Sequence, residues 1–160
     1  MDTFILITSL VLTIGQTFGV GASTFALIFY IMATQDGVID TSERRFMGAV
    51  YIVLRLGMVL IALALLGRLF IGIPLDSMGI IQWLLLGIIT LNAVLMSIHK
   101  MPMRFGPVLA GGSWYSFFLV GALPLGLLPL SVLIFLYVVF LCLFYLTFTI
   151  LRNMFRSKGS

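Results

Sequence analysis

The chain has 160 residues, of which 62% are hydrophobic and 9% are charged, and its formal net charge at pH 7 is +4. Soluble domains are about half apolar and about a quarter charged, so this composition excludes an ordinary soluble protein and indicates an integral membrane protein. The basic residues occur in short clusters between apolar runs, a topology signal that argues against nucleic-acid binding.

The first apolar run, residues 3–34, predicts a helix longer than one membrane span requires. No Lys or Arg precedes it, so we expect it to be retained and not cleaved as a signal peptide. Small residues recur on one of its faces at helical spacing: Gly15, Gly19, Ala22 and Ala26. Such a face lets another helix backbone approach closely, and we favour packing within the chain over a homodimer contact.

Residues 36–43 resemble the C-terminal half of an EF-hand calcium loop. With Gly37 at loop position 6, Asp36 falls at position 5, Asp40 at position 9 and Glu43 at position 12. The resemblance implies calcium binding by these three carboxylates, although loop positions 1 and 3 carry none. The same residues suit a helix start in which Asp40 is the N-cap and Glu43 completes a capping box, and we favour this interpretation.

The second apolar run predicts a helix over residues 42–71 with Arg55 in its middle. The nearest N-terminal charge, Arg45, is followed by nine uncharged residues, which places Arg55 near the middle of a hydrocarbon core about 30 Å thick. An arginine there costs about 3 kcal/mol and normally faces protein or water. No acidic residue lies within a predicted span, so its charge must be met by neutral dipoles, water or an anionic ligand.

The rest of the chain predicts three further helices, over residues 77–98, 107–123 and 130–152. A single kinked helix could replace the last two, since residues 108–151 carry no charge. Five spans gather most cations on one side: Arg44, Arg45, Lys100, Arg104, Arg152, Arg156 and Lys158. Positive charge marks the cytoplasmic side, so we choose five spans with the N-terminus outside and the C-terminus in the cytoplasm.

These elements predict one membrane domain over residues 1–160, a compact all-α bundle of five transmembrane helices in the plasma membrane. Side chains near the depth of Arg55 or toward the cytoplasm form a candidate ligand site: Arg55, Asn92, Ser23, Thr24, Tyr51 and His99. The expected ligand is a small anion, a carboxylate or phosphate metabolite, or a lipid headgroup. Solute permeation would favour a homo-oligomer, because one five-helix bundle rarely encloses a wide pathway.

The alternative is a non-catalytic membrane assembly subunit. In that case the small-residue face of the first helix meets a partner, and Arg55 only ties helices together through carbonyls and amides.

Patterns that carry catalysis are missing from the sequence: paired carboxylates, Ser/His/Asp spacing, Cys/His metal clusters and a phosphate-binding loop. His99 is the only histidine, which excludes bis-histidine haem ligation within one chain, and a His/Met pair has no attachment motif to support it. The single cysteine, Cys142, cannot form an intrachain disulfide. We therefore expect a non-enzymatic protein without a cofactor, and we leave open calcium at residues 36–43 and, in third place, a membrane enzyme or redox carrier.

Overall fold

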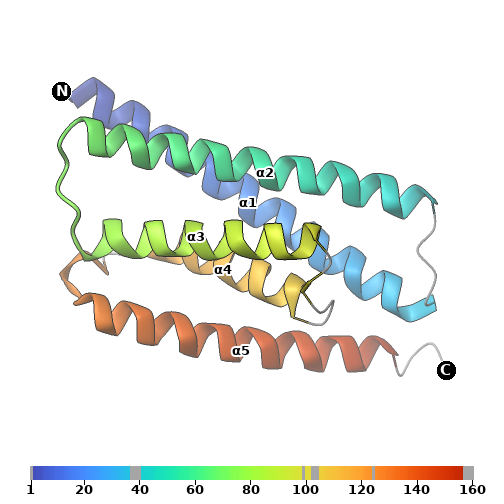
Figure 1. Cartoon of the computed structure of the whole chain (residues 1–160). Helices are drawn as coiled ribbons and strands as arrows, with labels where there is room; N and C mark the ends of the chain where they lie inside the picture. The colour runs from blue at the N-terminus through green and yellow to red at the C-terminus, as the bar shows by residue number, and fades with distance from the viewer. Residues whose placement is uncertain (1, 37–40, 99, 102–104, 124, 157–160) are drawn as a thin grey trace.

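The computed structural model describes residues 2–36, 41–98, 100–101, 105–123 and 125–156. The elements in chain order are α1 (Asp2–Asp36), α2 (Thr41–Phe70), α3 (Ser77–Ser97), α4 (Gly106–Ala122), the 3-10 turn η1 (Leu125–Leu127) and α5 (Leu130–Arg156), drawn in Figure 1. The expected all-α fold with five helices is confirmed. The largest difference in a helix end is in α5, which continues to Arg156 and not only to residue 152.

Four of the helices, α1, α2, α3 and α5, are long and apolar enough to cross a membrane. Large apolar side chains cover much of the outer surface, among them Phe70, which is 88% exposed. An outer surface of this kind suits lipid, because water would penalise so much exposed hydrocarbon. These features indicate a membrane protein.

The shortest α-helix, α4, has 17 residues and lies at the centre of the fold, where it packs against α1, α3 and α5. Its aromatic side chains Trp114 and Phe117 are almost completely buried. On the α5 side, Gly112 leaves room for Leu141, since a Cβ atom at Gly112 would lie 2.5 Å from the Leu141 side chain. Small residues therefore let α4 pack tightly between its neighbours.

The turn between α2 and α3 is determined by local sequence. Gly72 has a φ angle of +78°, a left-handed conformation that glycine adopts without steric cost. Pro74 follows, and it cannot continue a helix because it has no backbone N–H. Asp76 then caps α3 by accepting a hydrogen bond from the backbone N–H of Gly79 over 2.8 Å.

The packing of α1 against α2 is the most extensive in the fold. It depends on paired glycines: a Cβ atom added to Gly15 would lie 3.1 Å from the carbonyl oxygen of Gly57. One turn further along α1, a Cβ atom at Gly19 would overlap the ring of Trp114 from α4. Ala22 is also buried, and Ala26 is half-buried. The structure thus places the small-residue face of α1 inside the chain.

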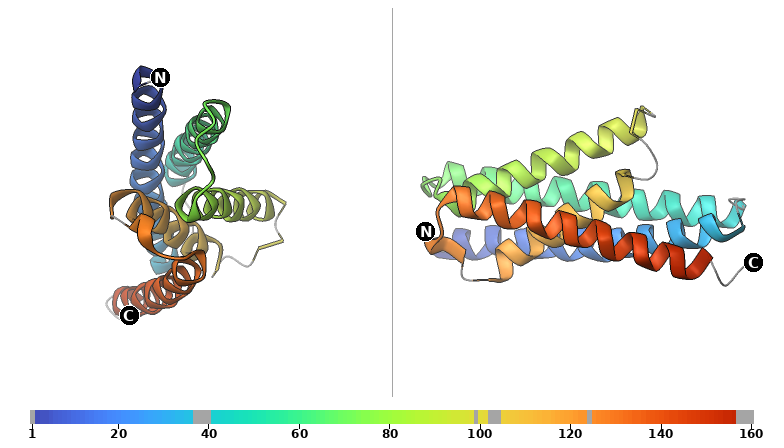
Figure 2. Two further views of the ribbon diagram at one scale, coloured as in Figure 1. Left: turned by 90° about the vertical axis from the view of Figure 1, so that its left-hand side faces the viewer. Right: turned by 90° about the horizontal axis from the view of Figure 1, so that it is seen from below.

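The contact between α2 and α3 is much sparser. The two helices lie close at the end where residues 71–76 join them and separate toward the other end, as the two views in Figure 2 show. The backbones of α2 and α3 therefore diverge toward the N-terminal end of α2. Arg55 belongs to the N-terminal half of α2, along which the two helices diverge.

Candidate functional site

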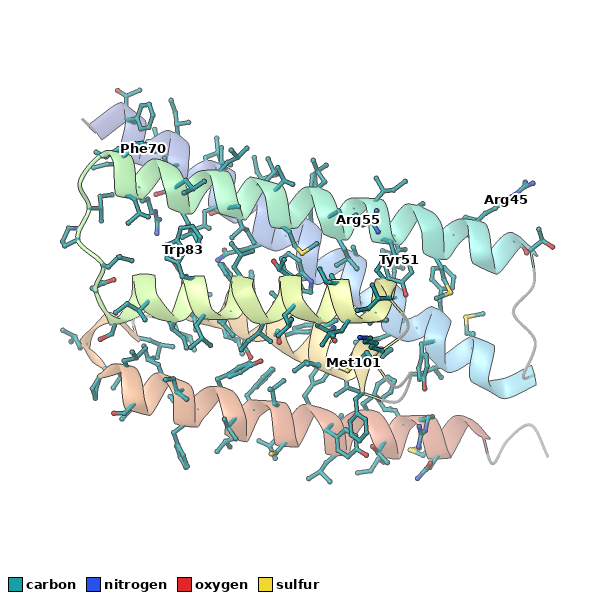
Figure 3. The ribbon with its side chains drawn as sticks, viewed as in Figure 1. Arg45, Tyr51, Arg55, Phe70, Trp83 and Met101 are labelled. Atoms are coloured by element: carbon teal, nitrogen blue, oxygen red, sulfur yellow. The ribbon has the colours of Figure 1, made fainter. Side chains whose placement is uncertain are left out.

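Arg55 lies on the face of α2 that also carries Tyr51 and Met58, because residues spaced by four and three share a helix face. Met58 contacts α3, with the hydroxyl of Thr90 4.0 Å from its sulfur. Figure 3 shows Tyr51 and Arg55 on successive turns of α2, along the part of the helix beside the C-terminal end of α3. Arg55 therefore belongs to the face of α2 that turns toward the diverging α3.

The guanidinium of Arg55 has no protein partner in the part of the chain that the structure describes, neither a hydrogen bond nor an ion pair. Its side chain and that of Tyr51 are exposed on the protein surface. An arginine in the middle of an apolar helix without a partner is energetically costly in lipid. The geometry is that of an open, cationic face and not of a closed cavity.

Three other predicted site residues take part in packing between or within helices. Ser23 is 2% exposed and donates a hydrogen bond to the carbonyl of Val20 in its own helix. Thr24 donates to the same carbonyl over 2.7 Å, so the hydroxyl of Tyr115 in α4 is the donor in the 2.7 Å bond between these two side chains. These hydroxyls are therefore engaged inside the protein.

Asn92 is 2% exposed, and its side-chain amide donates a hydrogen bond to the backbone carbonyl of Gly106 over 3.0 Å. This bond directs Asn92 toward α4 and away from the face of α2 that carries Arg55. The predicted group is thus divided: Arg55 and Tyr51 are exposed on α2, Asn92 and Ser23 are buried, and Thr24 is half-buried. His99 lies outside the described residues.

The predicted calcium ligands are Asp36, Asp40 and Glu43. Asp40 lies outside the described residues, as do the side chains of Asp36 and Glu43. The backbone of α1 is helical to its end at Asp36, so residues 32–36, which correspond to EF-hand loop positions 1 to 5, are helical. Elsewhere in the described part of the chain, no group of three His, Cys, Asp or Glu side chains is placed to hold a metal ion.

A second polar location lies at the opposite end of α2, near the turn into α3. A partly open cavity of about 390 Å³ is lined there by residues of α1, α2, α3, α4 and the connecting turn. Its polar lining consists of Ser9, Thr13, Gln16, Arg68, Asp76 and Gln82. We call it the Arg68 cavity, after the only cation in its lining.

Arg68 is half-buried and donates a hydrogen bond from Nη2 to the hydroxyl of Ser9 over 3.3 Å. Gln16 is 6% exposed, and its amide reaches the backbone carbonyl of Phe117 in α4 at 3.4 Å. Gly121 permits this approach, because a Cβ atom there would lie 2.7 Å from Gln16 Nε2. The cavity therefore combines a cation with buried amides from different helices.

Sequence reasoning assigned no role to this cavity, although one signal was present. Ser9, Thr13 and Gln16 are spaced by four and three residues, so they form a polar stripe on one face of α1. Polar side chains within a membrane span normally face the bundle interior. The stripe could thus have been predicted to face inward, but its meeting with Arg68 and Gln82 depends on how the helices pack.

We compared the chain with models of known protein families, with curated proteins and with solved structures, and none of them matched.

Proposed function

We propose that the protein is a multi-pass plasma-membrane protein that binds a small anionic solute or an anionic lipid headgroup at Arg55. The observation that carries this proposal is the lack of any hydrogen bond or ion pair from Arg55 to the described residues. A guanidinium has five N–H donors and a permanent charge, so an anion beside it would relieve a large energetic penalty. Arg55 is exposed on the protein surface, which gives an anion access to it.

The proposed orientation has the N-terminus outside, which puts the diverging ends of α2 and α3 on the cytoplasmic side. Positive charge favours this orientation, since Arg45 and Lys100 lie at that end. An anion would therefore reach Arg55 from the cytoplasm or from the inner leaflet. Binding is the minimum function, and transport of the bound solute is its natural extension.

The alternative, an assembly subunit with a structural Arg55, has less support. A structural arginine would donate hydrogen bonds to neighbouring helices, and Arg55 donates none within the described part of the chain. The small-residue face of α1 is occupied by α2 and by Trp114, which leaves it little room for a partner helix. A second copy of the chain could not neutralise Arg55 either, because its acidic residues lie outside the apolar runs.

The test measures thermal unfolding of the protein in lipid nanodiscs. Wild type and Arg55→Gln are compared in phosphatidylcholine alone, with added phosphatidylglycerol, and with added inorganic phosphate or acetate. A ligand at a hundred times its Kd stabilises the folded state by about 2.7 kcal/mol, which raises the unfolding midpoint. We expect such a rise in wild type and not in Arg55→Gln.

Arg45→Gln is the matched control, because Arg45 is an exposed cation on the same helix. It should retain the response to anions, as should Arg55→Lys in weaker form. A response to phosphatidylglycerol identifies a lipid headgroup, and a response to phosphate or acetate identifies a soluble anion. Equal responses of wild type and Arg55→Gln under every condition would contradict the proposal.

A further inference from the structure

We infer that the Arg68 cavity is a second binding site, for a small organic carboxylate. It lies near the turn from α2 into α3, at the end of the bundle opposite the diverging ends of these two helices. Arg68 would bind the carboxylate, and the amides of Gln16 and Gln82 would flank it. The inference is independent of Arg55. Arg68 is thirteen positions after Arg55 along α2, so the two arginines lie about 20 Å apart and point about 140° away from each other around the helix.

The strongest indication that the cavity binds a ligand is Gln82. Its side chain is 5% exposed and lines the cavity, yet its amide has no hydrogen-bond partner among the described residues. A buried amide without a partner costs about 1–3 kcal/mol, so polar side chains in the interior are normally paired. The amide atoms of Gln82 are reached from the cavity, so a polar ligand there can pair with them.

The expected charge of the ligand follows from Arg68. Its only hydrogen bond to the described residues goes to the neutral hydroxyl of Ser9, so most of its N–H donors are available. Asp76 also lines the cavity, but it forms no ion pair with Arg68 and is exposed at the rim, where its Oδ1 accepts from Gly79. An anionic group is thus favoured in the inner part of the cavity.

The size and the remaining walls indicate an organic anion. A cavity of about 390 Å³ is within the range of small-molecule sites, about 300–1,000 Å³, and exceeds what one inorganic ion requires. Apolar side chains form much of the remaining lining, among them Leu12, Leu65, Leu69, Ile73, Met78 and Trp83. They offer contact to a short hydrocarbon portion, while Arg68 and the two amides bind the carboxylate.

The test uses the reactivity of a single cysteine in the membrane-embedded protein. Cys142, the only native cysteine, is first replaced by serine, and Thr13→Cys then places a thiol at the edge of the cavity, because Thr13 lines it and is also exposed. Gln16, Gln82 and Arg68 all remain. Ile14→Cys is the matched control, because Ile14 lies at nearly the same depth of α1, is 39% exposed and does not line the cavity.

Each variant is treated with an anionic and a cationic methanethiosulfonate of similar size. At Thr13→Cys we expect the anionic reagent to react at least several-fold faster than the cationic one. This preference should disappear in Arg68→Gln and persist in Arg68→Lys. Equal rates of the two reagents, or an unchanged preference in Arg68→Gln, would show that the cavity holds only water and would overturn the inference. Ile14→Cys should react slowly with both reagents.

The ligand class is tested by protection of the same thiol in phosphatidylcholine vesicles. Butyrate should slow the reaction at Thr13→Cys, whereas the neutral isostere butyramide should not. Equal protection by inorganic phosphate, or protection seen only when the vesicles contain phosphatidylglycerol, would overturn the assignment to an organic carboxylate. Loss of this protection in Arg68→Gln but not in Arg55→Gln would separate the Arg68 cavity from the function proposed for Arg55.

Discussion

The side-chain amide of Asn92 in α3 donates a hydrogen bond over 3.0 Å to the backbone carbonyl of Gly106, the first residue of α4. This bond connects the two helices across the basic segment that separates them in sequence. Asn92 is 2% exposed, and its Oδ1 has no partner among the described residues. The Nδ2 donor is thus the part of the side chain that stabilises the fold.

Replacement of this donor by an acceptor should destabilise the protein. In Asn92→Asp a carboxyl oxygen faces the carbonyl of Gly106, and we expect the free energy of unfolding to fall by about 1–3 kcal/mol. Asn92→Leu should cost less, because it removes the unpaired Oδ1 together with the donor. Reversible unfolding in mixed micelles measures both values. A larger loss for Asn92→Leu than for Asn92→Asp would contradict this role of the amide.

The close approach of α1 to α4 predicts opposite effects for two neighbouring glycines. A methyl group in Gly19→Ala would overlap the Trp114 ring, and overpacking of this kind costs about 1–3 kcal/mol. In Gly21→Ala the new methyl group meets no atom within 4 Å, so the gain in helix propensity should leave stability equal or up to about 1 kcal/mol higher. The comparison uses the same unfolding assay, and equal losses for the two variants would rule out the packing explanation.

The hydrogen bond between Thr24 and Tyr115 can be isolated with a double-mutant cycle. Thr24→Val and Tyr115→Phe each remove one hydroxyl and keep most of the side-chain volume. Hydrogen bonds between membrane helices contribute on average about 0.6 kcal/mol and at most about 1.7 kcal/mol, so the coupling energy should fall in this range. A coupling energy of zero would mean that the two hydroxyls do not interact in the folded protein.

The proposed orientation in the membrane predicts different labelling at the two ends of α3. In a Cys142→Ser background, Leu75→Cys should react with a membrane-impermeant maleimide on intact cells, because residue 75 precedes α3 on the proposed outer side and is 52% exposed. Ser97→Cys, at the other end of the helix, should react only after permeabilisation. The reverse pattern would invert the orientation, and labelling of both on intact cells would exclude a spanning α3.

Helix positions were largely predictable from the sequence, since membrane spans must satisfy their backbone hydrogen bonds internally and need about 20 apolar residues. Residues that interrupt a helix marked several of the helix ends. Gly72 and Pro74 separate α2 from α3, and the charge balance argued for dividing the last apolar run into α4 and α5. The end of α5 was not predictable in this way. The apolar run stops at Arg152, whereas the helix continues to Arg156.

The choice of which side of each helix faces its neighbours was left to the tertiary structure. Lipid is as apolar as the protein interior, so hydrophobicity does not distinguish the packed face of a span from its outer face. Arg55 and Arg68 belong to one helix, but packing leaves Arg55 exposed and places the half-buried Arg68 beside buried amides from α1 and α3. The sequence by itself determined the helices and the energetic cost of their polar residues. Only the folded arrangement decided which of those residues meet.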